Sequence, residues 1–314
     1  LAVAARAGVS AVHVESVHEL RRADHVAAGL GVTLPVALRV NLAGPLPVAT
    51  LAMAGRPTQF GIDEGEVPDA LALALRCTHL EFVGFHFHCL SNHHDAPAHA
   101  RLVAGYLERA AKWAAAAGIP PRIVNAGGGI GVDYAALDRP FAWNAFCAAL
   151  TNVLDGEPEL ASPPLPAMLG RPATPAPVRL RFECGRFLVA AWGAYVVEVL
   201  DVKKTHGAAF AVVRGGTHHF RLPASWGHSH PFTVIPVEEW PYPFPRPGVK
   251  GRAVTVAGEL CSPKDILARD VAVDCLRAGD LLWFHHAGAY GWSISHHDFL
   301  HHPHPRRLFL GASA

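Results

Sequence analysis

Apolar residues in the first half of the chain follow two alternating periods. Short runs rich in Val, Ile and Leu are separated by longer stretches in which apolar residues recur every three to four positions, as in amphipathic helices. The predicted strands are 9–14, 34–40, 59–62, 80–89, 121–125 and 178–182, and the predicted helices are 1–7, 16–28, 66–76 and 96–117. Strands that alternate with helices of this length predict βα units and a parallel sheet, and their number favours a barrel.

The ends of these helices carry recognisable signals. Ser16 is predicted to cap the second helix, with Glu19 at the capping-box position, and Asp95 is a candidate cap for the helix that begins at Ala96. The opening helix has no N-cap residue and is closed by Gly8. We therefore expect the true start of the protein to lie upstream of Leu1.

The pattern changes at about residue 188, where the helical periods end. Short Val-rich runs separated by Gly and Pro predict strands at 194–202, 210–213, 253–257 and 281–284. Residues 161–178 contain six prolines and are predicted to be a loop. The sequence thus predicts two domains, a TIM-like (β/α)8 barrel in residues 1–188 that lacks its N-terminal strand, and a β-barrel or β-sandwich in residues 189–314.

The amino-acid composition and the distribution of charge favour some classes of function over others. The 314 residues are 51% hydrophobic, and 27 Lys and Arg nearly balance 26 Asp and Glu. Because the basic residues are scattered, we expect a small-molecule partner, with neither nucleic acid nor a membrane surface. The chain has no apolar run of membrane-spanning length, and its six cysteines form no CxxC pair. These features favour a cytoplasmic enzyme with reduced thiols.

Residues that could bind a ligand or take part in catalysis lie where the predicted barrel strands end. The turn 127–129 is a run of three glycines, which lets backbone N–H groups close on an anion such as a phosphate, although a structural turn needs glycine equally. Arg39, His86 and His88 end two other strands, and Glu183 ends the last. In a barrel, the carboxyl ends of the strands share one face and carry the catalytic groups.

Five motifs, taken in order, resemble those of the fold-type III pyridoxal-phosphate decarboxylases, the alanine-racemase-like superfamily of diaminopimelate, ornithine and arginine decarboxylases. They are GFHFHCLS at 84–91, GGG at 127–129, ECGR at 183–186, GELCSPKD at 258–265 and AGAYG at 287–291. The resemblance covers nearly the whole chain. It implies a lyase with pyridoxal 5'-phosphate (PLP) as cofactor, which decarboxylates an amino acid or an amino-acid-derived substrate through an external aldimine and a quinonoid.

The resemblance also assigns roles to individual residues. His88 would stack on the cofactor ring, and Glu183 would pair with the pyridinium nitrogen and keep the ring protonated as an electron sink. The residues that would bind the cofactor are His88, Ser91, Gly127, Gly128, Gly129, Glu183, Arg186 and Tyr290. Arg186 matches an arginine that contacts phosphate or the substrate carboxylate.

Two further assignments concern the second domain. Cys261 matches a cysteine that the partner subunit contributes across a dimer interface, where it helps to reprotonate the substrate carbon. The resemblance therefore implies a homodimer with shared active sites. Ser262 would contact the substrate. At this position ornithine and diaminopimelate enzymes have an acidic residue that binds the distal amine of their substrate, and this chain lacks that acidic residue. Its loss argues against a simple diamine precursor as substrate.

The chain departs from the family at other positions. The Schiff-base lysine would fall upstream of Leu1, and the lysines at 203, 204, 250 and 264 end none of the predicted barrel strands. We interpret this as truncation in preference to a pseudoenzyme. Gln59 replaces a basic residue, Leu90 a glycine and Cys184 the proline of the EPGR-like motif. The substrate is therefore expected to differ from that of the housekeeping enzymes.

Three alternatives remain open from the sequence. A racemase or epimerase could use the same scaffold, and a non-catalytic PLP-binding protein would result if the lysine is truly absent. The 21 histidines also suggest metal binding, but no HExxH-like spacing is present, so we expect histidines of the substrate pocket or the surface and no metal site. Adjacent pairs such as His218 and His219 would point to opposite faces of a strand.

Overall fold

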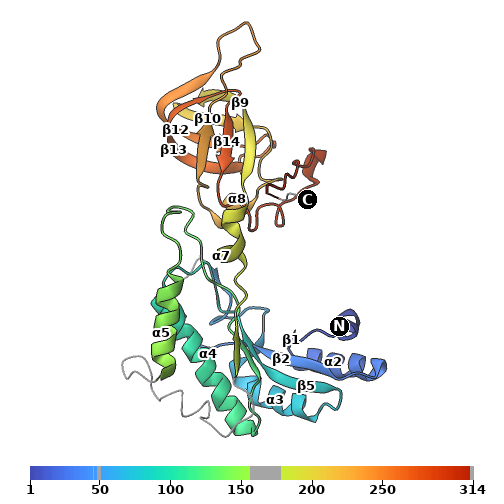
Figure 1. Ribbon diagram of the computed structural model, residues 1–314. Helices are drawn as coiled ribbons and strands as arrows, with labels where there is room; N and C mark the ends of the chain where they lie inside the picture. The colour runs from blue at the N-terminus through green and yellow to red at the C-terminus, as the bar shows by residue number, and fades with distance from the viewer. Residues whose placement is uncertain (45, 48–50, 156–177, 312–314) are drawn as a thin grey trace. The chain divides into compact units, whose positions relative to one another are not determined.

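The computed structural model describes residues 1–44, 46–47, 51–155 and 178–311, which form two compact units (Figure 1). The first unit contains residues 1–132 and 140–184, and the second contains residues 133–139 and the chain from Gly185 onward. Each unit has its own sheet. Nearly all of the predicted proline-rich loop at 161–178 lies outside the described residues.

A parallel sheet organises the first unit. Its strands are β1 (Val12–Val14), β2 (Leu34–Asn41), β5 (Leu80–Phe87), β7 (Ile123–Asn125) and β8 (Arg179–Arg181), paired in this order, and β4 (Ile62–Asp63) pairs with the end of β2. Seven of the eight residues of β5 are buried, because both faces of a parallel sheet are covered. A separate two-stranded ribbon joins β3 (Leu51–Ala52) and β6 (Leu90–Ser91).

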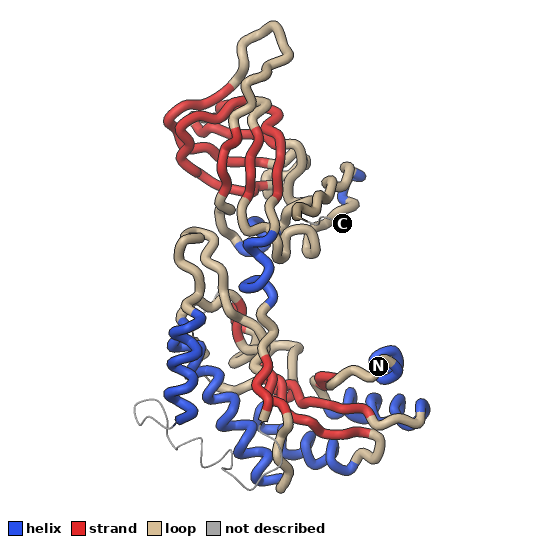
Figure 2. Tube along the Cα trace, viewed as in Figure 1, coloured by secondary structure: helices blue, strands red, loops and turns tan. Residues whose placement is uncertain are grey.

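Helices cover one face of this sheet (Figures 1 and 2). They are α2 (Val17–Leu30), α3 (Val67–Arg76) and α4 (Ala96–Ala117), and the unit also contains α1 (Ala2–Arg6), η1 (Glu64–Glu66) and α5 (Trp143–Asp155). The predicted caps are confirmed, because Ser16 Oγ accepts a hydrogen bond from the Glu19 N–H and Asp95 Oδ1 accepts one from the Ala98 N–H. None of the described helices is both long enough and apolar enough to cross a membrane.

The second unit is built on a six-stranded sheet of order β11-β14-β9-β10-β12-β13. Its elements are β9 (Tyr195–Thr205), β10 (Ala208–Val213), β11 (Phe232–Ile235), β12 (Gly248–Ala257), β13 (Ile266–Arg277), β14 (Leu281–Phe284), α7 (Gly185–Val189), η2 (Ala190–Trp192), α8 (Leu222–Trp226) and η3 (Phe299–His301). Figure 2 shows these strands curving around a shared interior, which Val199, Val254 and Leu282 fill.

The predicted fold class, a parallel βα barrel-type sheet followed by an all-β domain, is confirmed. The sequence did not predict α5, β11 and β13. The signal for α5 was present, since Phe146, Leu150 and Val153 recur at helical spacing and are its buried residues. Strand β13 was harder to find, because charged residues interrupt its apolar positions and its burial pattern shows no strict alternation.

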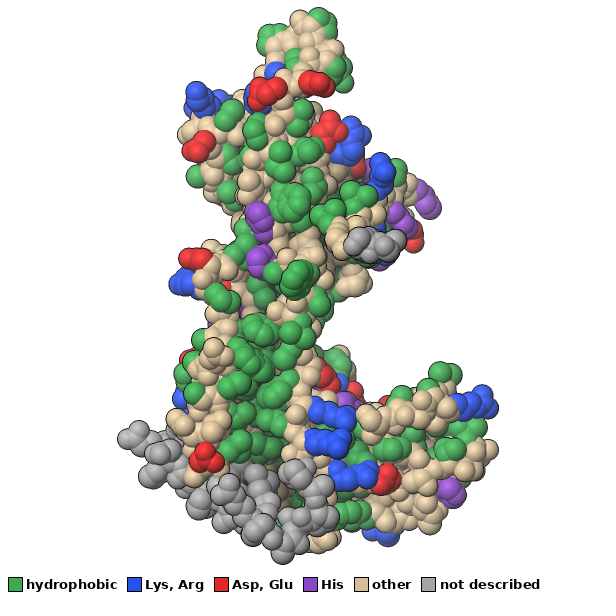
Figure 3. Space-filling model, viewed as in Figure 1, with side chains coloured by type: hydrophobic (Ala, Val, Ile, Leu, Met, Phe, Trp, Pro, Cys, Tyr) green, Lys and Arg blue, Asp and Glu red, His purple; other side chains and the backbone are tan. Residues whose placement is uncertain are grey.

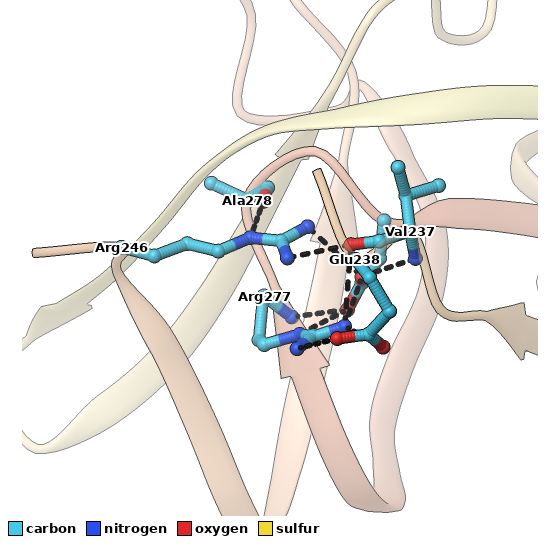
Figure 4. A network of polar contacts seen from close by, with 6 residues as sticks. Val237, Glu238, Arg246, Arg277 and Ala278 are labelled. Atoms are coloured by element: carbon cyan, nitrogen blue, oxygen red, sulfur yellow. Dashed lines mark hydrogen bonds and ion pairs between the residues drawn. The ribbon is translucent and has the colours of Figure 1, made fainter. Parts of the chain in front are cut away.

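A buried carboxylate ties the end of β13 to the start of β14 (Figure 4). Only 1% of the Asp280 side chain is exposed, and it accepts hydrogen bonds from the N–H groups of Val237 and Arg277 at 3.0 and 2.8 Å. Its Oδ1 also lies 3.0 Å from Arg246 and 3.1 Å from Arg277. Burial raises the pKa of Asp280, but the hydrogen bonds from Val237 and Arg277 outweigh it and the net pKa is lowered.

Replacing this carboxylate should destabilise the second unit. Asp280→Asn leaves two arginines without their shared anion, and the loss of one partner from a buried ion pair costs about 3 kcal/mol. The free energy of unfolding in urea measures the loss. Asp274→Asn, which changes an exposed residue of the same β13 strand, is the matched control and should change it by less than about 0.5 kcal/mol. Equal effects of the two substitutions would contradict the proposed role of the network.

Candidate active site

Glu183 is the centre of a polar cluster at the carboxyl end of the parallel sheet. The register of the sheet places His86 of β5 beside Asn125 of β7, and β8 ends two residues before Glu183. Asn125 Nδ2 donates a hydrogen bond to Glu183 Oε1 at 2.9 Å, and His86 Nε2 lies 3.3 Å from the same oxygen. The Glu183 N–H donates to the carbonyl of Gly127 at 2.8 Å. The glutamate is therefore fixed through both its backbone and its side chain.

Glu183 is ionised at neutral pH. Contact with His86 is the largest cause that lowers the pKa of Glu183, to about 2. His13 stacks on His86 with ring centroids 4.1 Å apart, and burial, followed by the charge of His86, lowers the pKa of His13 to about 4. The Glu183 side chain is 46% exposed. An accessible carboxylate that stays ionised suits a protonated ring nitrogen, and the residues present thus fit a pyridoxal ring.

The glycine turn lies against this cluster. A Cβ at Gly127 would collide with the carbonyl of Phe87, one at Gly128 would lie 2.7 Å from Glu183 O, and one at Gly129 would lie 2.7 Å from Leu90 O. Gly127 and Gly129 also have φ of +66° and +103°. Close packing against neighbouring strand ends therefore requires all three glycines, whatever they bind.

Two of the three amides proposed to hold phosphate already have partners. The Gly127 N–H donates to Asn125 Oδ1 at 2.9 Å, and the Gly128 N–H donates to His88 Nδ1 at 3.1 Å. Within the described residues, the Gly129 N–H has no hydrogen-bond partner. The Gly129 N–H is therefore available to donate a hydrogen bond to an anion. The N–H groups of Gly127 and Gly128 would first have to break the hydrogen bonds that they already make.

His88 and Ser91 lie on the other side of the turn. Because His88 Nδ1 accepts the Gly128 N–H, a neutral ring carries its proton on Nε2, and burial lowers the pKa of His88. A neutral, fixed imidazole is suited to stack on an aromatic ring. Ser91 is part of β6, whose Leu90 carbonyl lies against Gly129. The structure thus brings together all the predicted cofactor-binding residues of the first unit.

Some sequence expectations need revision at this edge of the sheet. Arg39, a candidate catalytic group, pairs with Glu15 at 2.7 Å, and its guanidinium lies 4.8 Å from the centroid of the Phe60 ring. It stays close to the cluster, because burial and then the charge of Arg39 lower the pKa of His88. Asn125 and His13 were not predicted, although Asn125 directly precedes the glycine turn. None of the chain's five lysines is at the carboxyl end of a described strand of the parallel sheet, because Lys112 is on α4 and the other four belong to the second unit.

The second unit holds a buried cation. The side chain of Arg186 is buried, and its guanidinium lies 3.7 Å from the centroid of the Trp226 ring and 4.9 Å from that of Tyr290. Burial lowers the pKa of Arg186, and none of the ion pairs among the described residues includes it. A desolvated guanidinium beside two aromatic rings is suited to bind a phosphate or a carboxylate.

Cys261 and Ser262 occupy the loop after β12. The Asp265 carboxylate shapes this loop by accepting hydrogen bonds from the N–H groups of Leu260, at 2.9 Å, and Thr217, at 2.6 Å. The Cys261 thiol is free and exposed, and Ser262 lines a cavity of about 660 Å³. All six cysteines are free in the structure.

The lowered pKa of Glu183 predicts a specific pH dependence. A carboxylate whose pKa is about 2 in the folded chain, against an ordinary 4.5, stabilises the fold above about pH 4.5, and this contribution is lost as pH falls towards 2. Glu183→Gln should therefore unfold at a lower urea concentration than the wild type at pH 6, and this gap should shrink on acidification. Glu81→Gln removes an exposed carboxylate of the same sheet and is the control. A gap for Glu183→Gln that is constant down to pH 2 would contradict the assignment.

Comparisons with known proteins show the family to which the chain belongs. The family model described as "Pyridoxal-dependent decarboxylase, C-terminal sheet domain" matches residues 50–288. A 2-[(L-alanin-3-ylcarbamoyl)methyl]-2-hydroxybutanedioate decarboxylase of Staphylococcus aureus is 47% identical over 96% of this chain and 72% of its own length. An L-glutamyl-[BtrI acyl-carrier protein] decarboxylase of Niallia circulans is 30% identical over 97% of this chain and 68% of its own length.

Solved structures give the same result. A point mutant of the diaminopimelate decarboxylase of Helicobacter pylori, complexed with L-lysine, superposes with a TM-score of 0.74 at 25% identity, over 94% of this chain. The chain spans 66% of the length of that structure. The segment matched by the family model includes both the glycine turn and the cysteine loop. The chain belongs to the pyridoxal-dependent decarboxylases, the carboxy-lyases that use PLP to decarboxylate amino-acid-derived substrates.

Proposed function

We propose that the cluster around Glu183 is the cofactor site of this decarboxylase. The observation that carries the proposal is the ionised Glu183 carboxylate, held by Asn125 and His86 within contact of the glycine turn. A bound PLP ring would supply the electron sink that accepts the electron pair left when a carboxylate departs as CO2. Glu183 keeps the proton on the ring nitrogen, because a carboxylate with so low a pKa does not take that proton itself.

The neighbouring residues bind and orient the cofactor. His88 presents a neutral imidazole whose orientation Gly128 fixes, and it is suited to stack on the ring. The free N–H of Gly129 and the hydroxyl of Ser91 are donors for the phosphate. In the second unit, Arg186 offers a guanidinium without a carboxylate partner and Tyr290 a hydroxyl beside it. Family resemblance assigns Tyr290 to the phosphate, and Arg186 to the phosphate or the substrate carboxylate.

We further propose that the substrate carries carboxylates at the end remote from the reacting amino acid. Arg221, Lys264 and Arg269 line the cavity of the second unit together with Ser262. None of the ion pairs among the described residues involves these three cations, and the one acidic residue of the lining, Asp265, is occupied by backbone N–H groups. The cavity therefore has uncompensated positive charge.

The Staphylococcus aureus relative points to the same chemistry. By its name, that enzyme acts on a hydroxybutanedioate joined through an amide to an alanine unit. Such a molecule has two carboxylates beyond the amino-acid end, and they would match the arginines and the lysine of the cavity. We propose a substrate of this class, an amino acid linked to a polycarboxylate, in place of a diamine precursor.

A cytoplasmic homodimer is also part of the proposal. Large apolar side chains are exposed in the second unit, including Leu188 at 61%, Trp192 at 88% and Leu310 at 85%. In Figure 3, hydrophobic side chains of this unit are exposed among scattered charges of both signs. Apolar surface of this kind is typical of an interface that a second copy covers. The exposed thiol of Cys261 would then reach the partner's substrate, as the family resemblance implies.

Product analysis tests the reaction class. The full-length protein that contains this chain, saturated with PLP, is given an alanine–hydroxybutanedioate amide, and CO2 release and exchange of the α-proton with deuterated water are followed together. We expect one CO2 per substrate consumed, with deuterium appearing only in the decarboxylated product. Exchange without CO2 release would support a racemase or epimerase, and the absence of both would support a non-catalytic PLP-binding protein.

Kinetics of cavity variants test the substrate class. Arg221→Ala and Arg269→Ala should each raise KM roughly 10-fold or more and leave kcat nearly unchanged, because each loses a charged hydrogen bond to a remote carboxylate. Arg252→Ala, an exposed position on β12 outside the cavity, is the matched control. An equal KM for all three variants would exclude this cavity as the polycarboxylate subsite while leaving the decarboxylation itself unaffected.

A further inference from the structure

Three side chains that are distant in sequence converge in the second unit. His218 lies in the turn after β10, Glu259 follows β12, and His302 follows η3. Each offers one ligand atom, and these atoms all lie within 4.8 Å of one another. His302 Nδ1 is 3.7 Å from Glu259 Oε1, and the rings of His218 and His302 have centroids 4.9 Å apart. The three residues form a compact set of two imidazoles and one carboxylate.

His218 is the unusual member of the set. Its side chain is fully buried, and within the described residues neither ring nitrogen has a hydrogen-bond partner. Buried polar atoms are almost always paired, because leaving one unsatisfied costs about 1–3 kcal/mol. A buried imidazole that faces a carboxylate and a second imidazole, without bonding to protein, indicates a ligand that is shared by all three.

The surrounding backbone holds the three residues in place. His219 Nε2 contacts the carbonyl of Pro303 at 2.7 Å, and its Nδ1 contacts the Tyr195 hydroxyl at 3.0 Å. His219, the neighbour of His218, therefore holds the turn that carries His218 next to the segment that carries His302. The Glu259 N–H donates to the carbonyl of Gly215 at 2.8 Å, which joins the loop of Glu259 to the turn of His218. The pair at 218 and 219 lies in a turn and not in a strand, and its two members have different partners.

We propose that His218, Glu259 and His302 bind a divalent first-row transition metal ion, with Zn²⁺ as the ion best suited to two imidazole nitrogens and one carboxylate oxygen. Zn–N and Zn–O bonds of about 2.0–2.2 Å place tetrahedral ligand atoms about 3.4 Å apart. The three ligand atoms must therefore move closer together to bind the ion. Rotation of the Glu259 and His302 side chains, which are partly exposed, allows this movement. Three protein ligands leave a fourth position for water or another ligand.

The site is independent of the proposed cofactor site. His13, His86 and Glu183 form another group that could hold a metal, but they belong to the first unit and to the cluster around Glu183. Two other histidines of the C-terminal segment have their own contacts, since His297 bonds to the Trp292 carbonyl and His304 to Asp298. The proposal therefore concerns one set of three residues and not histidine-rich sequence in general.

Metal titration of the chelator-treated full chain tests the proposal. We expect one equivalent of Co²⁺ to bind with the visible absorption of a tetrahedral Co²⁺ complex, Zn²⁺ to displace it, and Zn²⁺ to raise the thermal midpoint of the chain. Glu259→Gln and His302→Ala should weaken binding roughly 100-fold. Both residues are partly exposed, so these variants are expected to fold, which circular dichroism checks.

Two controls locate the bound ion. His304→Ala removes a histidine of the same segment that is not in the set, and Glu183→Gln removes the carboxylate of the other group. Both variants should bind Co²⁺ as the wild type does. The proposal is overturned if the wild type binds no Co²⁺, if Glu259→Gln and His302→Ala bind it unchanged, or if His304→Ala or Glu183→Gln loses it. None of these measurements depends on decarboxylase activity.

Discussion

The candidate active site depends on the register of three neighbouring parallel strands. His86, Asn125 and Glu183 lie at or just after the ends of β5, β7 and β8, and one carboxylate oxygen is the point where their side chains meet. Parallel pairing aligns the ends of the strands, and a shift of one residue in β7 would turn Asn125 to the opposite face. The glycine turn keeps this register compatible with close packing, because a Cβ at Gly127 would strike the Phe87 carbonyl.

The same constraint explains why the glycines have two roles. Their lack of side chains first permits the strand ends to approach. Of the three amides of the turn, only that of Gly129 is then without a hydrogen-bond partner among the described residues. Asn125 connects the two roles, since its Oδ1 accepts the Gly127 N–H while its Nδ2 donates to Glu183. One amide side chain thereby orients the turn and fixes the position of the carboxylate, whose pKa is lowered chiefly by contact with His86.

The second unit uses a different arrangement of charge. Asp280 is buried between Arg246 and Arg277, and its ion pairs with these two arginines stabilise the junction between β13 and β14. Arg186 is equally buried but is covered by the rings of Trp226 and Tyr290, with no carboxylate among the described residues paired to it. A cation that has been desolvated without an anion is poised to bind one, whereas a compensated cation only stabilises the fold.

The sequence by itself determined the alternation of strands and helices, the caps at Ser16 and Asp95, the β-rich second unit and the motifs that place the chain in its family. These follow from local periodicity and from the residue types that a turn or a cap requires. Only the tertiary structure decided which polar groups meet: that Arg39 is occupied by Glu15, that Asn125 holds Glu183, and that His218 faces Glu259 and His302. Such contacts join segments far apart in the chain, so strand register and chain packing create them, and no local pattern encodes them.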